Sequence, residues 1–134
     1  MPQESAWPNA DRQARSVILC IDDEEKLLMI RQMVLSAAGY TVLTASDGRT
    51  GLELFRCKHI DLVITDHLLP DLSGTQLAVE MKRVKPDVPI ILLTGLPDAP
   101  EGAEHANVVL TKGLPVPDFL RSVAELANRS NPSI

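Results

Sequence analysis

The chain has 134 residues and a mass of 14.6 kDa, which is the size of one domain. Apolar residues make up 45% of it and charged residues 23%, which argues against disorder and against a coiled coil. The 13 basic residues are scattered and are outnumbered by 18 acidic ones, giving a net charge of −5, so we expect no direct nucleic-acid binding.

No apolar stretch approaches the roughly 18 residues that a membrane span needs. The first 16 residues also lack the apolar segment of a secretory signal, so we expect a cytoplasmic protein with no membrane attachment. The two cysteines, Cys20 and Cys57, can build neither a disulfide framework nor a metal site.

Residues 1–15 are polar and aperiodic, and we expect a flexible tail there. The apolar run 17–21 predicts a strand buried on both faces. A helical stretch follows and ends before Gly39, a typical residue at a helix C-terminus. Its inward-facing stripe is predicted to consist of Leu27, Ile30, Val34 and Ala37.

Two more strands follow. Residues 41–45 predict the second strand, and residues 47–57 a helix with Asp47 as its capping residue. Residues 60–65 predict the third strand, which ends at Asp66. The stretch 47–57 carries Leu52 and Phe55 at helical spacing.

The last predicted elements complete the alternation of strands and helices. A helix begins at Ser73 or Gly74 and is ended by residues 85–87, with Leu77, Met81 and Val84 on one side. The remaining elements are a fourth strand at 89–94, a shorter fifth strand at 108–111, and a helix at 116–129 with Leu120, Val123 and Leu126 facing inward.

Strands separated by helices indicate crossover connections and a parallel sheet. We therefore predict an α/β, flavodoxin-like, doubly wound sheet of five strands in the order 2-1-3-4-5. Residues 16–129 would form this domain, followed by a short C-terminal tail at 130–134.

Polar residues stand at the ends of four predicted strands, where sites form in such sheets. Asp22 and Asp23 follow the first strand, Asp66 the third, Thr94 the fourth and Lys112 the fifth. Three neighbouring carboxylates repel one another and need a cation, and oxygen ligands favour Mg²⁺. A metal, an ammonium and a hydroxyl around a carboxylate suit a phosphoryl group, which the carboxylate itself can accept.

These residues resemble the receiver domain of two-component response regulators, and the resemblance covers residues 16–129. It suggests a stand-alone, chemotaxis-type single-domain receiver. The matching motifs are the pair Asp22-Asp23, the run Asp66-His-Leu-Leu-Pro-Asp-Leu-Ser-Gly74, Ile-Ile-Leu-Leu-Thr94-Gly95 and Leu-Thr-Lys112.

The resemblance implies that Asp66 accepts a phosphoryl group from a histidine kinase or a histidine phosphotransfer protein. Thr94 would contact a phosphoryl oxygen and Lys112 would pair with the group. Such a domain is not an enzyme, and it signals by contact with a downstream protein. The implied Mg²⁺ ligands are Asp23, Asp66, the backbone carbonyl of Leu68 and, through water, Asp22.

The chain departs from the family pattern on the side that usually reads out phosphorylation. Val109 stands where an aromatic residue or histidine is usual, and Gly113 stands where proline is usual. Only 17 residues, 95–111, separate Thr94 from Lys112, about one helical turn fewer than usual. We therefore predict that the fourth helix is shortened or absent, that the usual switch is lost, and that a partner senses the pocket rim directly.

Two residues beside Asp66 complete the prediction. His67 is expected at the pocket rim, without a catalytic role. The apolar side chain of Leu68 would overhang the pocket mouth, where it cannot position an attacking water, so we expect slow self-hydrolysis of the acyl phosphate.

Other readings fit less well. A haloacid-dehalogenase-like phosphatase needs a second acid two residues after its nucleophile, but Leu68 stands there. A nucleotide or flavin binder needs a glycine-rich or hydroxyl-rich loop after the first strand, where this chain has acidic residues 22–25. The main alternative is a receiver-fold docking module in which phosphorylation is vestigial.

Overall fold

A computed structural model describes residues 16–95 and 99–130 of the protein. The tails predicted at 1–15 and 131–134 lie outside the described residues. The strands are β1 (Val17–Ile21), β2 (Thr41–Ala45), β3 (Leu62–Asp66), β4 (Ile90–Thr94) and β5 (Val108–Thr111). The helices are α2 (Glu25–Ala37), α3 (Gly48–Cys57), α4 (Gly74–Val84), the 3₁₀ turn η1 (Ala103–His105) and α5 (Val116–Ser130).

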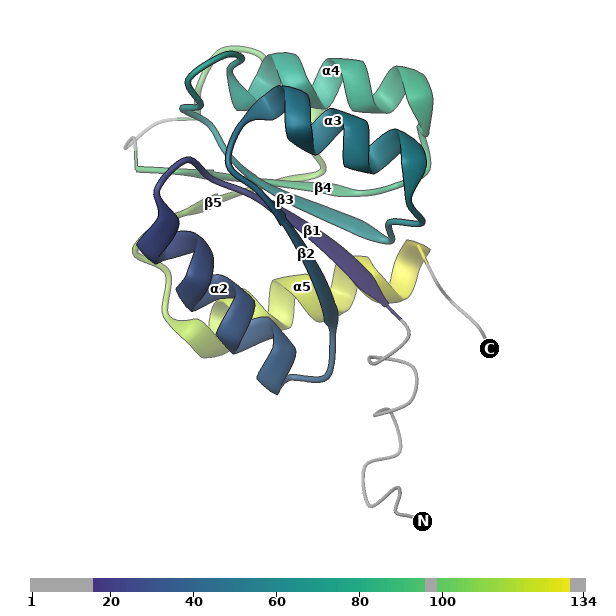
Figure 1. Ribbon diagram of the computed structural model, residues 1–134. Coiled ribbons are helices and arrows are strands. Elements are labelled where there is room, and N and C mark those ends of the chain that lie inside the picture. Colours follow the sequence, from purple (N-terminus) through teal and green to yellow (C-terminus); the bar gives the residue numbers. More distant parts are fainter. Residues whose placement is uncertain (1–15, 96–98, 131–134) are drawn as a thin grey trace.

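The five strands form one parallel sheet in the order β2-β1-β3-β4-β5, which confirms the predicted doubly wound fold. Helices α3 and α4 cover one face of the sheet, and α2 and α5 cover the other (Figure 1). Strands β3 and β4 are buried along their whole length, as their continuous apolar sequences predict. None of the helices in the described ranges is long and apolar enough to cross a membrane.

Side-chain caps mark the starts of α3 and α4, and the cap of α3 is the predicted one. The side chain of Asp47 accepts the N–H of Thr50 at the start of α3. Ser73 and Gln76 form a reciprocal capping box at the start of α4. At the end of α2, Gly39 has a φ of 103°, which explains why glycine follows this helix.

The side of α2 that faces the sheet differs from the prediction. Leu28 and Leu35 are buried, whereas Ile30 is 55% exposed and Ala37 is also exposed. The helix carries apolar residues on nearly all sides, so hydrophobic spacing alone allowed several orientations. In the observed orientation, the side chain of Arg31 reaches Asp22 at the carboxyl end of the sheet. On α4, Leu77 and Met81 are buried, whereas Val84, which ends the helix, is 37% exposed.

The connection between β4 and β5 confirms the predicted loss of a helix. Among its described residues, the only helical element is the three-residue turn η1. A polar clamp closes the connection, because Asn107 Oδ1 accepts both the N–H of Ile90 (2.9 Å) and the ammonium of Lys82 (2.8 Å). Strand β5, at the edge of the sheet, is only half-buried or exposed, in contrast to β4.

Candidate functional site

Three carboxylates converge at the carboxyl end of the sheet. Asp22, Asp23 and Asp66 each offer one oxygen atom, and these atoms all lie within 4.8 Å of one another. Asp22 and Asp66 are buried, while Asp23 is exposed. The predicted acidic cluster therefore forms as the sequence indicated.

The arrangement of the strands brings these residues together. Strands β1 and β3 are neighbours, with Ile21 paired to Thr65, so the residues that follow Ile21 emerge beside Asp66. Gly74 closes the loop after β3 by donating its N–H to the carbonyl of His67 (2.7 Å). A Cβ atom at Gly74 would lie 2.6 Å from the carbonyl oxygen of Asp66, so only glycine permits this close approach.

Lys112 supplies the positive charge that the sequence predicted. Its ammonium lies 2.9 Å from Asp66 Oδ1, and its side chain is 30% exposed. Thr94 ends β4 and is buried. Both residues line a pocket of about 230 Å³ together with Asp66, His67, Leu68 and Gly95. Asp66 thus sits at the base of a small pocket with the predicted hydroxyl and ammonium beside it.

Burial and the neighbouring cations shift the pKa of Asp66 in opposite directions. Burial raises the pKa of the Asp66 carboxyl above its ordinary value of 3.8, and the charge of Asp22 raises it further. The hydrogen bond and charge of Lys112 lower it, as does the charge of Arg31, but the net direction is upward. An additional cation at this site would favour the charged carboxylate.

Sequence reasoning missed one charged member of the site. Arg31 extends from α2, and its Nη1 lies 2.5 Å from Oδ2 of Asp22. The other oxygen of Asp22 accepts the backbone N–H of Glu24 (2.9 Å). The missed signal was a lone arginine within an otherwise apolar stretch of helix, nine residues after Asp22.

His67 and Leu68, the two residues after Asp66, form part of the pocket rim. The side chain of Leu68 is 68% exposed at the pocket mouth, in agreement with its predicted position. His67 lines the same pocket, and within the described ranges its buried Nδ1 has no hydrogen-bond partner.

The donor set fits a hard divalent cation. Carboxylate oxygens are the ligands that Mg²⁺ prefers, and the exposed Asp23 leaves room for water on one side. That Asp22, Asp23, Asp66 and the Leu68 carbonyl hold Mg²⁺ remains a prediction.

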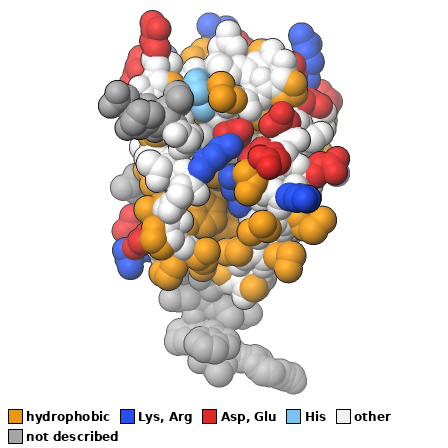
Figure 2. Space-filling model, turned by 90° about the vertical axis from the view of Figure 1, so that its left-hand side faces the viewer, with side chains coloured by type: hydrophobic (Ala, Val, Ile, Leu, Met, Phe, Trp, Pro, Cys, Tyr) orange, Lys and Arg blue, Asp and Glu red, His pale blue; other side chains and the backbone are white. Residues whose placement is uncertain are grey.

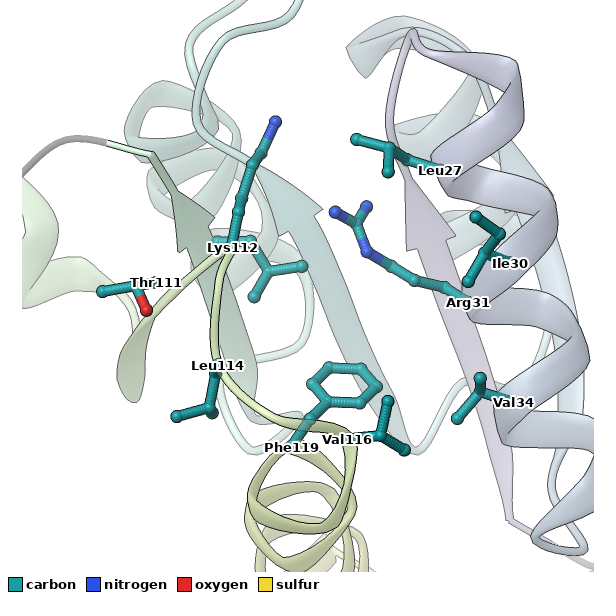
Figure 3. A pocket seen from close by; sticks show the side chains of 10 residues that line it. Leu27, Ile30, Arg31, Val34, Thr111, Lys112, Leu114, Val116 and Phe119 are labelled. Carbon is teal, nitrogen blue, oxygen red and sulfur yellow. The ribbon is translucent and has the colours of Figure 1, made fainter.

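An apolar groove of about 140 Å³ lies between α2 and the start of α5, and it shares Lys112 with the pocket around Asp66. Figure 3 shows Arg31 reaching out of α2 and Lys112 rising opposite it, with Val34, Leu114, Val116 and Phe119 below them. Figure 2 shows acidic and basic side chains gathered at this end of the molecule, next to a hollow surrounded by hydrophobic ones. The apolar residues of the groove include Leu27, Ile30, Val34, Leu114, Val116 and Phe119.

Comparison with known proteins agrees with this geometry. The sequence-family model for the response regulator receiver domain matches residues 18–121 of this chain. The chain is 31% identical over 120 residues to the transcriptional regulatory protein GlrR of Escherichia coli, a match that covers 87% of this chain. It spans only 27% of that relative's length.

Two solved structures share the fold closely. A response regulator receiver domain protein from Clostridium thermocellum superimposes with a TM-score of 0.77 at 33% identity, covering 89% of this chain and 99% of that one. The response regulator TrrA of Thermotoga maritima, in complex with Mg²⁺ and BeF, gives a TM-score of 0.79 at 30% identity, covering 83% of this chain and 98% of that one. Fold, acidic pocket and sequence match lead to one conclusion: this chain belongs to the family of response regulator receiver domains.

Proposed function

We propose that Asp66 accepts a phosphoryl group in a Mg²⁺-dependent reaction, with a phosphohistidine on a kinase or phosphotransfer protein as the donor. The observation that carries the proposal is the convergence of three carboxylates with Lys112 beside a pocket that Thr94 lines. The cytoplasm is the expected compartment, since histidine kinases present their phosphohistidine there.

The chain's own residues would divide the chemistry between them. An oxygen of Asp66 attacks the phosphorus of the donor, an O–P bond forms, and the N–P bond to the imidazole breaks. Lys112 then exchanges its carboxylate partner for a phosphoryl oxygen, and the hydroxyl of Thr94 donates to another. Because Lys112 is already 2.9 Å from Asp66, this exchange needs little movement.

Mg²⁺, held by Asp23, Asp66 and the Leu68 carbonyl, with Asp22 acting through water, would neutralise charge on the phosphoryl oxygens. TrrA, the relative described in complex with Mg²⁺ and BeF, supports this assignment by its likeness in fold and sequence.

The groove beside the pocket is the proposed docking place for the donor. A partner that delivers a phosphoryl group to Asp66 must cover the pocket mouth, and Lys112 lines both the pocket and the groove. Ile30 lines the groove and is 55% exposed, so a partner helix can bury it. We expect Ile30→Glu to slow transfer from a panel of phosphorylated histidine phosphotransfer domains, while Val84→Glu on α4 leaves it unchanged.

The proposed output also follows from the altered connection between β4 and β5. With η1 in place of a full helix and Val109 on β5, the usual helical readout surface is reduced. We propose that a downstream protein contacts the pocket rim itself, and that the domain acts as a phospho-acceptor with at most slow self-dephosphorylation.

The test is the intact mass of the protein after incubation with Mg²⁺ and acetyl phosphate. We expect one added phosphoryl group, which is lost in Asp66→Asn and in the absence of metal. Asp87→Asn, an exposed aspartate after α4, serves as the matched control and should be phosphorylated like the wild type. No added mass while Mg²⁺ binds would reject the proposal and favour a docking module.

A further inference from the structure

Arg31 occupies an unusual place on α2. It lies between Leu28 and Leu35 on the side of the helix that faces the sheet, where a further apolar residue would continue the buried stripe. Its side chain is only 13% exposed, and its stem lines the apolar groove. Burial of an arginine at such a position is costly unless its charge is paired.

The pairing partner is a carboxylate of the acidic cluster formed by Asp22, Asp23 and Asp66. Nη1 of Arg31 contacts Oδ2 of Asp22, a side chain with no exposed surface. Glu24 donates its N–H to Oδ1, so both oxygens of Asp22 already accept a hydrogen bond. The pair is therefore buried beside the acidic cluster and differs from a solvent-exposed ion pair, which contributes little.

A count of formal charges shows what Arg31 does to the pocket. The three carboxylates carry −3, Lys112 and Arg31 carry +2, and the net charge of the cluster is −1. Without Arg31 the cluster would carry −2. Because a divalent cation is attracted by negative charge and repelled by positive charge, Arg31 must weaken its binding.

We propose that Arg31 is a counter-cation that competes with Mg²⁺ for the acidic cluster of Asp22, Asp23 and Asp66 and thereby sets the metal affinity of this receiver domain. It is a positioning residue, since it acts through Asp22 rather than on the phosphoryl group. Lys112 cannot replace it, because Lys112 pairs with Asp66. The proposal rests on the metal site of the proposed function, and it adds a residue outside the motifs that define that site.

The test is a calorimetric titration of the full chain with MgCl₂ at fixed pH and ionic strength. We expect Arg31→Met to bind Mg²⁺ about tenfold more tightly than the wild type, because the competing charge is gone. Arg31→Lys keeps a cation at this position and should stay within about threefold of the wild type. Arg83→Met removes the same charge from an exposed pair with Glu80 on α4 and should leave the affinity unchanged.

Thermal unfolding provides a second readout. Arg31→Met leaves three carboxylates with one cation, so its metal-free form should unfold at a lower temperature and gain more from Mg²⁺ than the wild type does. Arg31→Gln, which keeps a hydrogen-bond donor, should behave in the same way and provides a replacement should Arg31→Met not fold.

The outcomes separate this inference from the proposed function. Equal or weaker Mg²⁺ binding by both neutral variants would overturn the role of Arg31, whether or not Asp66 is phosphorylated. Tighter binding by these variants in a protein that shows no phosphorylation would support the role of Arg31 and reject the proposed function instead.

Discussion

Lys112 Nζ and Asp66 Oδ1 lie 2.9 Å apart, although they come from strands that are not neighbours in the sheet. Asp66 ends β3 and Lys112 follows β5, with β4 between them. The side chain of Lys112 therefore crosses the end of β4 to reach the Asp66 carboxylate, and the pocket lies at this end of β4.

Replacement of this lysine tests its part in phosphorylation. We expect Lys112→Met to slow phosphorylation of Asp66 by about 100-fold, because the charge that stabilises the phosphoryl oxygens is lost. The pKa of Asp66 should also rise further, since Lys112 lowers it. The rate of mass gain with acetyl phosphate measures the effect. Lys26→Met, at an exposed position on α2, is the control; equal rates in both variants would contradict the role of Lys112.

Gly74 is predicted to be irreplaceable. A Cβ atom there would lie 2.6 Å from the carbonyl oxygen of Asp66 and 2.9 Å from Cα of His67, and backbone atoms cannot easily move aside. We expect Gly74→Ala to lower the free energy of unfolding in urea by about 2–3 kcal/mol. At Gly113 a Cβ atom meets nothing within 4 Å, so Gly113→Ala should change the free energy of unfolding little. Similar losses in both variants would refute the argument.

Asp71 makes stability depend on pH. Burial pushes the pKa of its carboxyl upward, but bonds from backbone N–H groups, those of Gly48 and Arg49 first among them, bring the pKa below its ordinary value of 3.8. The unfolded state therefore binds the proton more readily, and the contribution of Asp71 is complete above pH 3.8 and lost as the pH falls through the lower folded-state pKa.

The matching measurement compares Asp71→Ala with the wild type in urea unfolding from neutral pH to about pH 3. At neutral pH we expect the variant to be less stable by about 1 kcal/mol, the usual loss when a side chain that accepts the first N–H groups of a helix is removed. The difference should shrink toward the acidic end. A difference that stays constant across this range would show that the charge of Asp71 is not the cause.

The clamp at Asn107 is expected to stabilise the short connection before β5. Asn107→Ala leaves the N–H of Ile90 and the ammonium of Lys82 without this acceptor. We expect a loss of about 1–2 kcal/mol in the free energy of unfolding. His105→Ala, at an exposed site in η1, provides the comparison and should lose much less.

Leu68 is predicted to prolong the phosphorylated state. Its exposed apolar side chain at the pocket mouth offers no hydrogen bond to an attacking water. In Leu68→Asn the amide can position that water, so we expect the acyl phosphate to hydrolyse at least about tenfold faster. Decay of the phosphorylated mass after removal of the donor gives the rate; unchanged decay would rule out Leu68 as the cause of persistence.

Most of the fold and of the candidate site could be predicted from the sequence, because both depend on the position of the strands. Continuous apolar runs located β1, β3 and β4, and the polar residues at their ends had to meet once the strands were parallel. Helix α2 could not be oriented in this way, since its apolar residues surround it. Arg31 was missed for the same reason, because its role depends on which side of α2 faces the sheet.

The clamp of Asn107 was missed for a different reason. It joins residues that are 17 and 25 positions apart, through contacts that leave no periodic signal in the sequence. Such contacts follow from the final packing of the shortened connection and are not encoded in any local pattern.

Because β5 is less buried than β3 and β4, the strands differ in their stability against local opening. Strands β3 and β4 are sealed on both faces, so we expect their amide protons to exchange with solvent only when the whole domain unfolds. Strand β5 is an edge strand whose residues are only partly buried or exposed, and it can detach locally at a far lower cost. Asp66 ends β3, which opens only with the whole domain, whereas Lys112 follows β5, which can open locally. Each brief opening of the edge thus removes the ammonium from the carboxylate while the acidic cluster stays in place.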